Sequence, residues 1–301
     1  IVLIEFVAFL YWNFPLLIVL LFGNLISLMC NYLLINDCWV WYHWLDYCGT
    51  GVTYMQFHFA FTFSLLMWLY RKSIKKCHNY YKHFNMSFFL KKSFQQFLLL
   101  GFVIYLQCFI ATIYTIPWDN YLIYSNSWSY PSERILFTIG YVPIEEYMFF
   151  GLDAAIVCGI FFIAFEGVDI ERKFCYGRNC LNFGAVIMVL GAGGLFIPNC
   201  HYLAAIILWA TPVICLQTWW DFNTIAFYKT PLLKCILTST IYLTIADKWA
   251  LERGIWRIDK SLFDIYPGMP FEECFFFFVT SIMCSFGFLL TLTTFGIKIT
   301  D

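Results

Sequence analysis

Charged residues are scarce in this chain, and their scarcity excludes several classes of protein. Only 12% of the 301 residues are charged, whereas 61% are hydrophobic and 22% are aromatic. An average soluble domain has about 25% charged residues. The net charge of −1 provides no basic face of the kind that binds nucleic acid, so no partner of that class is expected.

Short motifs for cofactors, metals and several catalytic classes are also missing. The sequence has no GxGxxG, the dinucleotide fingerprint, no DxxxD for magnesium diphosphate, and no EExxxR of a glutamate-type membrane protease. Its 13 cysteines include no CxxC pair and suit packing better than disulfide or zinc chemistry. A retinal photoreceptor needs a buried Schiff-base lysine, but the last apolar stretch has only Lys298, at its end. We therefore expect neither a metal nor another cofactor.

Long apolar stretches dominate what is present. About 20 apolar residues cross the hydrocarbon core of a membrane as a helix. The pattern predicts an all-α, multi-pass membrane helix bundle with about seven or eight transmembrane helices. The candidate stretches are 9–35, 54–70, 94–116, 140–165, 181–199, 201–220, 232–247 and 271–297.

The basic residues are distributed unevenly between the expected loops. Seven of the 18 Lys and Arg lie in the loop 71–92, which the positive-inside rule places in the cytoplasm. Alternating from this loop assigns 13 basic residues to the cytoplasmic side and five to the other. The linker at 36–51 is rich in Trp and Tyr, as is typical of a membrane interface.

One cassette of residues occurs twice, at 116–150 and 246–278. Each copy has an Asp, a Trp nine residues later, and a Pro-x-Glu-Glu sequence that leads into phenylalanines. A repeat of this kind constrains the architecture before any single residue is interpreted. The matching acids are Asp119, Glu145 and Glu146 in the first copy and Asp247, Glu272 and Glu273 in the second.

The order of the apolar stretches predicts how the two copies are related. Four membrane passes lie between them, so the halves should be parallel repeats whose acids face the same side of the membrane. The stretch from Tyr54 resembles the one from Tyr202, which gives three helices per half. We expect an extra N-terminal helix and linker at 1–53, repeat 1 at 54–165, a connector helix at 166–200 and repeat 2 at 201–301.

The acids have two interpretations. Glu in a first helical turn is ordinarily a capping residue. Two matching copies of acids near a membrane instead favour a functional role for these residues. We expect each cassette to begin where a helix ends, near Pro117 or Ala246, so Asp119 and Asp247 would meet an unfavourable helix dipole. Consecutive glutamates point about 100° apart around a helix, so at most one of each pair should face a given pocket. Asp153 is a lesser candidate.

The cassettes carry a family resemblance. The strings PWDNYLIY, VPIEEYMFF, ADKWALERGIW and MPFEECFFFF resemble the two halves of the flavin-independent lycopene cyclase domain of fungi, archaea and some bacteria. The resemblance covers about 54–295, and the segment before Tyr54 is not part of the usual domain. In fungi the domain is fused to a phytoene synthase, so a phytoene synthase or another carotenoid enzyme is an expected partner, beside membrane lipid.

The resemblance implies an isomerase of carotenoid biosynthesis that converts the linear ψ ends of lycopene into β-ionone rings. A proton adds, an alkene closes on the cation, and a ring proton leaves, without net redox change and without a cofactor. The six acids would take part, and Glu145→Gln and Glu272→Gln would each abolish every ring if one composite pocket uses both halves. The alternative function is a non-enzymatic carrier or receptor for an isoprenoid. The aromatic residues expected to contact the substrate and stabilise a cation are Trp118, Trp128, Trp249, Trp256, Phe149 and Phe275.

Overall fold

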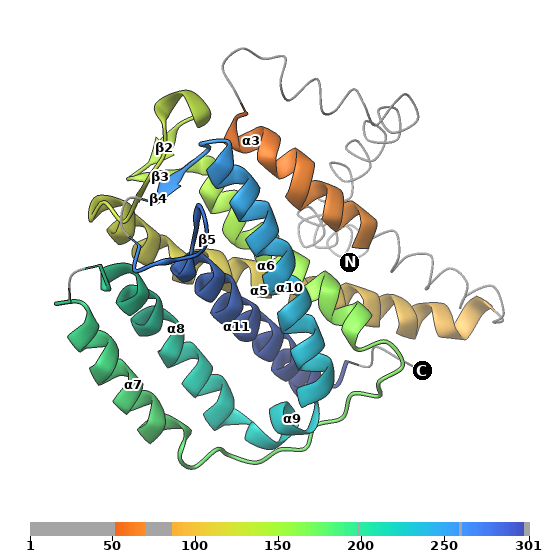
Figure 1. Ribbon diagram of the computed structural model, residues 1–301. Coiled ribbons are helices and arrows are strands. Elements are labelled where there is room, and N and C mark those ends of the chain that lie inside the picture. The colour runs from red at the N-terminus through yellow and green to blue at the C-terminus, as the bar shows by residue number, and fades with distance from the viewer. Residues whose placement is uncertain (1–51, 70–85, 198, 259–260, 298–301) are drawn as a thin grey trace, which may run out of the picture. The chain divides into compact units, whose positions relative to one another are not determined.

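The computed structural model describes residues 52–69, 86–197, 199–258 and 261–297, which form mostly helices (Figure 1). The expected helix at 9–35, the linker at 36–51 and most of the basic loop at 71–92 lie outside these residues. The rest of this subsection concerns the part from Val52 onward, which is a compact unit of its own.

The helices follow the apolar stretches closely. Helix α3 (Tyr54–Phe57) continues into the π-helix η1 (His58–Phe63), and helical residues follow to 69. The others are α5 (Met86–Tyr124), α6 (Ile144–Ala164), α7 (Cys180–Gly194), α8 (His201–Trp220), α9 (Phe222–Phe227), α10 (Lys229–Glu252) and α11 (Phe271–Phe295).

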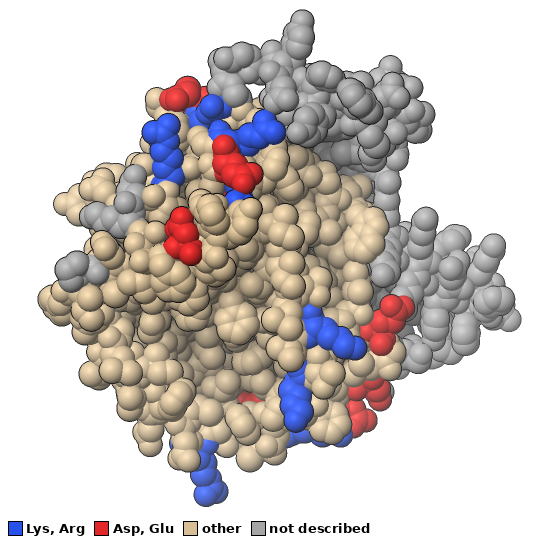
Figure 2. All heavy atoms as spheres, viewed as in Figure 1, with Lys and Arg blue, Asp and Glu red and all other residues tan. Residues whose placement is uncertain are grey.

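Within the described residues, four helices are long and apolar enough to cross a membrane. They are Leu99–Tyr124 in α5, then α6, α8 and α11, with α7 shorter but also apolar. Large apolar side chains on several helices point outward; Val189 and Leu190 of α7 are 72% and 70% exposed. Figure 2 shows charged side chains gathered at two ends of one face, with a broad uncharged band between them. This surface suits lipid contact and supports a membrane protein.

Helices α6 and α11 form the middle of the bundle and pack against each other. Both also contact α5 and α10, while η1 packs on α6, and α8 on α11 (Figure 1). Helix α7 packs mainly on α8. The centre therefore consists of the two helices that begin with the Glu-Glu pairs.

The expectation that each cassette begins at a helix end is wrong. Helix α5 passes through Pro117 and ends only at Tyr124, and α10 continues beyond Ala246 to Glu252. A proline removes one helical hydrogen bond. In an apolar environment the chain nevertheless continues as a helix, because a helix satisfies the other backbone N–H and C=O groups internally. Asp119 and Asp247 consequently lie inside helices, and not beyond their ends.

Short strands organise the loops of the two cassettes. Hairpins of matching position precede α6 and α11, and their turns contain Gly140 (φ 67°) and Gly268 (φ 75°), a conformation that favours glycine. A third pairing joins the cassettes to each other: β1 runs antiparallel to β4, with Ser129 opposite Arg257. The strands are β1 (Trp128–Ser129), β2 (Thr138–Ile139), β3 (Val142–Pro143), β4 (Arg257–Ile258), β5 (Asp264–Tyr266) and β6 (Met269–Pro270), and a 3₁₀ turn, η2, covers Ser132–Arg134.

Candidate active site

The second glutamate of each pair is held by a tyrosine from the first helix of the same half. Tyr54 donates a hydrogen bond to Glu146 Oε2, and Tyr202 donates to Glu273 Oε1 over 2.8 Å. Both tyrosines lie in the first turn of their helices, α3 and α8. The similarity between the stretches from Tyr54 and Tyr202 therefore extends to the contact that each makes.

The two aspartates lie beside these glutamates. Asp119 is fully buried and Asp247 is 3% exposed. Asp119 interacts electrostatically with Glu146 and Glu273, and Asp247 interacts with the same two glutamates. Four carboxyl groups from both cassettes thus share one buried region. Like charges repel strongly in a poor solvent, so a negative charge on one of these acids disfavours a charge on its neighbours.

Hydrogen bonding distinguishes the two aspartates. Asp247 Oδ1 accepts a bond of 3.0 Å from Trp256 Nε1, while its Oδ2 is buried without a partner. Both oxygens of Asp119 lack a partner, as does the indole nitrogen of Trp128, the counterpart of Trp256. The two halves of the site are therefore similar in composition but different in the contacts of their acids.

Glu146 also has a second donor that Glu273 does not share. Tyr130, which follows β1, donates to Glu146 Oε2 over 2.7 Å. Burial, assisted by the negative field of Glu146, raises the pKa of Tyr130 well above its usual value, so its hydroxyl stays protonated and remains a donor. The corresponding position in the second cassette, two residues after the Trp, is Ile258, which has no hydroxyl.

The first glutamate of each pair contacts its own loop. Glu145 Oε1 accepts the backbone N–H of Leu136 at 2.8 Å, and Glu272 Oε1 accepts that of Leu262 at 2.6 Å. Each bond ties the loop before a hairpin to the helix that follows it. The remaining oxygen of each side chain is buried without a partner. Of the six predicted acids, the structure thus brings four together and uses two to anchor loops.

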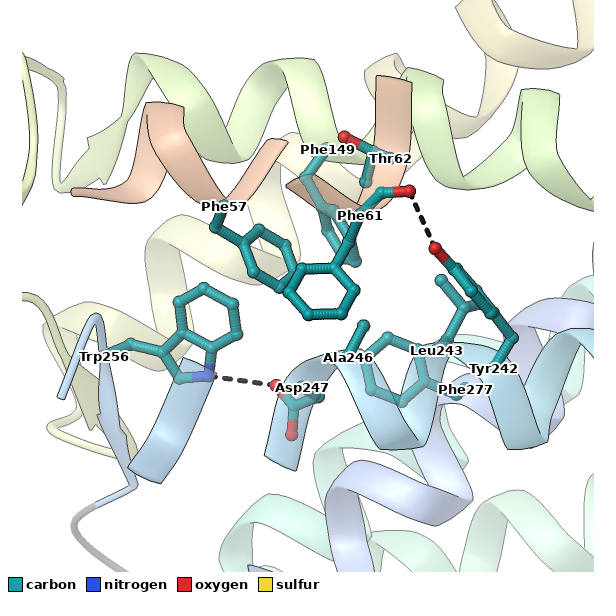
Figure 3. A pocket seen from close by; sticks show the side chains of 10 residues that line it. All are labelled: Phe57, Phe61, Thr62, Phe149, Tyr242, Leu243, Ala246, Asp247, Trp256 and Phe277. Atoms are coloured by element: carbon teal, nitrogen blue, oxygen red, sulfur yellow. Dashed lines mark hydrogen bonds between the residues drawn. The ribbon is translucent and has the colours of Figure 1, made fainter. Parts of the chain in front are cut away.

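A small cavity adjoins Asp247 (Figure 3). Its volume is about 10 Å³, close to the space that one water molecule requires. Ring faces of Phe and Trp can stabilise a nearby cation, and Asp247 is the acid in the cavity wall. Apart from Asp247, the lining residues are Phe57, Phe61, Thr62, Phe149, Tyr242, Leu243, Ala246, Trp256 and Phe277.

Two of the predicted aromatic contacts, Trp256 and Phe149, line this cavity. Trp249 packs against Phe61, one of the lining residues, with ring centres 5.0 Å apart. Phe275 stacks on Phe271 at the start of α11. These last two lie outside the cavity wall.

The remaining two predicted aromatics lie in the other half of the site. Trp118 stacks on Trp209 with ring centres 4.7 Å apart, and Trp128 meets Tyr202 edge-on at 5.1 Å. Trp128 belongs to a buried hydrophobic cluster between α5, α8 and α11, and the partly buried Trp118 packs against it.

Sequence reasoning missed three tyrosines and three phenylalanines of the site. Only Tyr54 and Tyr202 had a signal, since each begins one of two similar stretches. The phenylalanines are indistinguishable by sequence from the many other aromatic residues of the helices. The missed residues are Tyr54, Tyr130, Tyr202, Phe57, Phe61 and Phe277.

Comparisons with known proteins identify lycopene cyclases among the relatives of this chain. The chain is 33% identical over 187 residues to a lycopene beta-cyclase of Halobacterium salinarum, which covers 60% of this chain and 78% of that protein. It is 29% identical over 209 residues to a bifunctional lycopene cyclase/phytoene synthase of Arthroderma gypseum, covering 61% of this chain and 35% of the relative. The corresponding protein of Phycomyces blakesleeanus is 29% identical over 255 residues, covering 78% and 38%.

No protein-family model matches the chain, and no solved structure matches it. The archaeal relative is nevertheless similar over most of its length, and the matched cassettes of acids occupy one buried site. The chain belongs to the lycopene beta-cyclase family.

Proposed function

We propose that this protein is a lycopene β-cyclase that converts ψ ends of lycopene into β-ionone rings by acid and base catalysis. One observation carries the proposal: carboxyl groups from two cassettes meet beside a cavity walled by aromatic rings. Cyclisation requires a proton donor, a proton acceptor and an apolar pocket that tolerates a cation. The relatives named as lycopene cyclases support the same activity.

Asp247 is the proton donor in this proposal. Its Oδ2 has no hydrogen-bond partner, and the residue lines the cavity. A proton passes from Oδ2 to the terminal double bond of the ψ end, which leaves a tertiary cation. The neighbouring alkene then closes on this cation and forms the ring bond. Trp256, which donates to Oδ1, holds the carboxyl group in place and stabilises the carboxylate after transfer.

Glu146 is the proton acceptor. Two tyrosine hydroxyls donate to its Oε2, and hydrogen bonds of this kind stabilise a carboxylate. Loss of the ring proton to Glu146 forms the ring double bond and leaves a neutral product. One proton has entered and one has left, so the reaction is an isomerisation. The proton returns from Glu146 to Asp247 within the acid cluster, since the two groups interact.

This assignment replaces the expectation that Glu145 and Glu272 exchange the protons. Each accepts a backbone N–H of its own loop, which favours an anchoring role. The composite character of the proposed site is retained, because Asp247 comes from the second cassette and Glu146 from the first.

The proposal includes a fold of two parallel three-helix repeats, at 54–165 and 201–301, with a connector at 166–200, in a multi-pass protein. Matched contacts support it. Tyr114 donates to the backbone oxygen of Trp209 and Tyr242 to that of Phe61, both over 2.7 Å. The antiparallel pairing of β1 with β4 is the contact that a two-fold axis between the cassettes would generate.

Expression in a lycopene-accumulating bacterium tests the function. Cyclisation predicts that γ-carotene or β-carotene replaces lycopene in the extracted pigment, whereas a carrier or receptor leaves lycopene unchanged. The bacterial host supplies phytoene synthase separately. Ring formation in the membrane fraction, with inactive Asp247→Asn as the matched control, would assign the activity to this chain. Unchanged lycopene with the chain present in the membrane would refute it.

A further inference from the structure

The residues immediately before the two aspartates differ greatly in size. Ala246 precedes Asp247 and lines the cavity. Trp118 precedes Asp119 and occupies the corresponding position in the other half. Its indole donates to the backbone oxygen of Ala205 over 3.1 Å and stacks on Trp209 and Phe276.

The residues next to Ala246 and Trp118 in the structure also differ in size between the two halves. Counting from Tyr54 and Tyr202, the first residues of the matching stretches, places Phe61 opposite Trp209 and Phe57 opposite Ala205. The second half of the site thus combines Ala246 with two phenylalanines. The first half combines Ala205 with two tryptophans, whose rings stack on Phe276.

The two groups share one backbone contact, although Phe61 lies in the π-helix η1 and Trp209 in the α-helix α8, and their side chains differ in volume. Matching tyrosines hold the backbone at Phe61 and at Trp209 with bonds of equal length. In the first half, Trp118, Trp209 and Phe276 form a mutual stack with ring centres 4.7 to 5.7 Å apart. These separations are typical of closely packed aromatic rings. Beside Asp247 the smaller side chains leave the cavity.

We propose that the protein has a single ring-forming pocket, beside Asp247, whose size is set by Ala246, and that Trp118 closes its counterpart beside Asp119. This inference rests on the proposed lycopene cyclase function and specifies its binding site. A ψ end is larger than the cavity, so its entry requires rotation of Phe57 or Phe61. The two ends of one lycopene molecule use the same pocket in succession, and the monocyclic carotenoid is an obligatory intermediate.

Enlarging residue 246 tests the pocket. Ala246→Val and Ala246→Leu place added methyl groups in the cavity, and overpacking of this kind is unfavourable. We expect the rate of ring formation, per molecule of protein in the membrane, to fall with side-chain size, by about tenfold for Leu. The matched control is Ala185→Leu, which adds the same methyl groups at an exposed position of α7 and should retain wild-type activity. Ala246→Val is the milder variant if Ala246→Leu does not reach the membrane.

The ratio of the two ring-forming steps separates one pocket from two. Time courses of lycopene, γ-carotene and β-carotene in isolated membranes provide both rate constants. With one pocket, Ala246→Val slows both steps equally, so their ratio stays at the wild-type value. A loss of fold alone would lower the amount of protein and not the rate per molecule.

Three results would overturn the inference while leaving the proposed function intact. They are a wild-type rate in Ala246→Val and Ala246→Leu, accumulation of γ-carotene as their end product, and a loss in Ala185→Leu as large as in Ala246→Leu. The absence of rings with the wild-type chain would instead refute the proposed function itself.

Discussion

Replacing one glutamate of the first pair separates proton transfer from loop anchoring. Glu146 receives both tyrosine hydroxyls on the same oxygen, Oε2. The amide oxygen of glutamine can therefore accept the same two bonds, and Glu146→Gln should fold and pack normally. What the variant loses is a group that accepts a proton at neutral pH.

The expected magnitude follows from this loss. A positioned general base contributes roughly 10²- to 10⁴-fold to a rate, or about 3 to 5 kcal/mol in the activation barrier. We expect Glu146→Gln to lower ring formation by this factor. In Glu145→Gln the amide oxygen still accepts the N–H of Leu136, now as a neutral hydrogen bond worth about 1 kcal/mol less. Its rate should stay within about fivefold of wild type.

The assay compares initial rates of ring formation in membranes from a lycopene-accumulating bacterium, normalised to the amount of each variant by immunoblot. Thermal unfolding in detergent checks that both variants fold. The assignment of Glu146 is refuted if Glu146→Gln retains a rate within about threefold of wild type. It is equally refuted if Glu145→Gln, folded and present in the membrane, loses as much activity as Glu146→Gln.

Three further outcomes are expected. Tyr130→Phe removes one of two donors to Glu146 and should slow ring formation by about tenfold. The alkaline limb of the pH–rate profile should not change, because the raised pKa of Tyr130 keeps its hydroxyl neutral there. A shifted alkaline limb would contradict this. Glu272→Ala deprives the Leu262 N–H of its acceptor and should lower the free energy of unfolding by about 1 to 3 kcal/mol. Glu272→Gln keeps an acceptor and should lower it less. Equal unfolding midpoints for both variants would argue against an anchoring role of Glu272. Exhaustive chelation should leave the rate unchanged, and a loss that one added metal restores would oppose a metal-free reaction.

Sequence alone determined the membrane character and the main helices. The apolar stretches at 140–165, 201–220 and 271–297 correspond to α6, α8 and α11, because the length and composition of a spanning helix are local properties. The doubled cassette likewise identified the acids, because a repeat is visible in the order of the residues themselves. The helix ends expected near Pro117 and Ala246 were both wrong. At Pro117 the rule for proline in water was applied to a helix whose surroundings favour continuation.

The tertiary structure decided which acids meet and where space remains. Periodicity indicated that at most one glutamate of each pair faces a given pocket, but only the packing of α6 and α11 brings the second of each pair to Tyr54 or Tyr202. Tyr130 reaches Glu146 through a loop, for which no periodic pattern exists. The cavity beside Asp247 depends on the summed volumes of side chains from several helices. Such a volume is a property of three-dimensional packing, and no spacing along one chain encodes it.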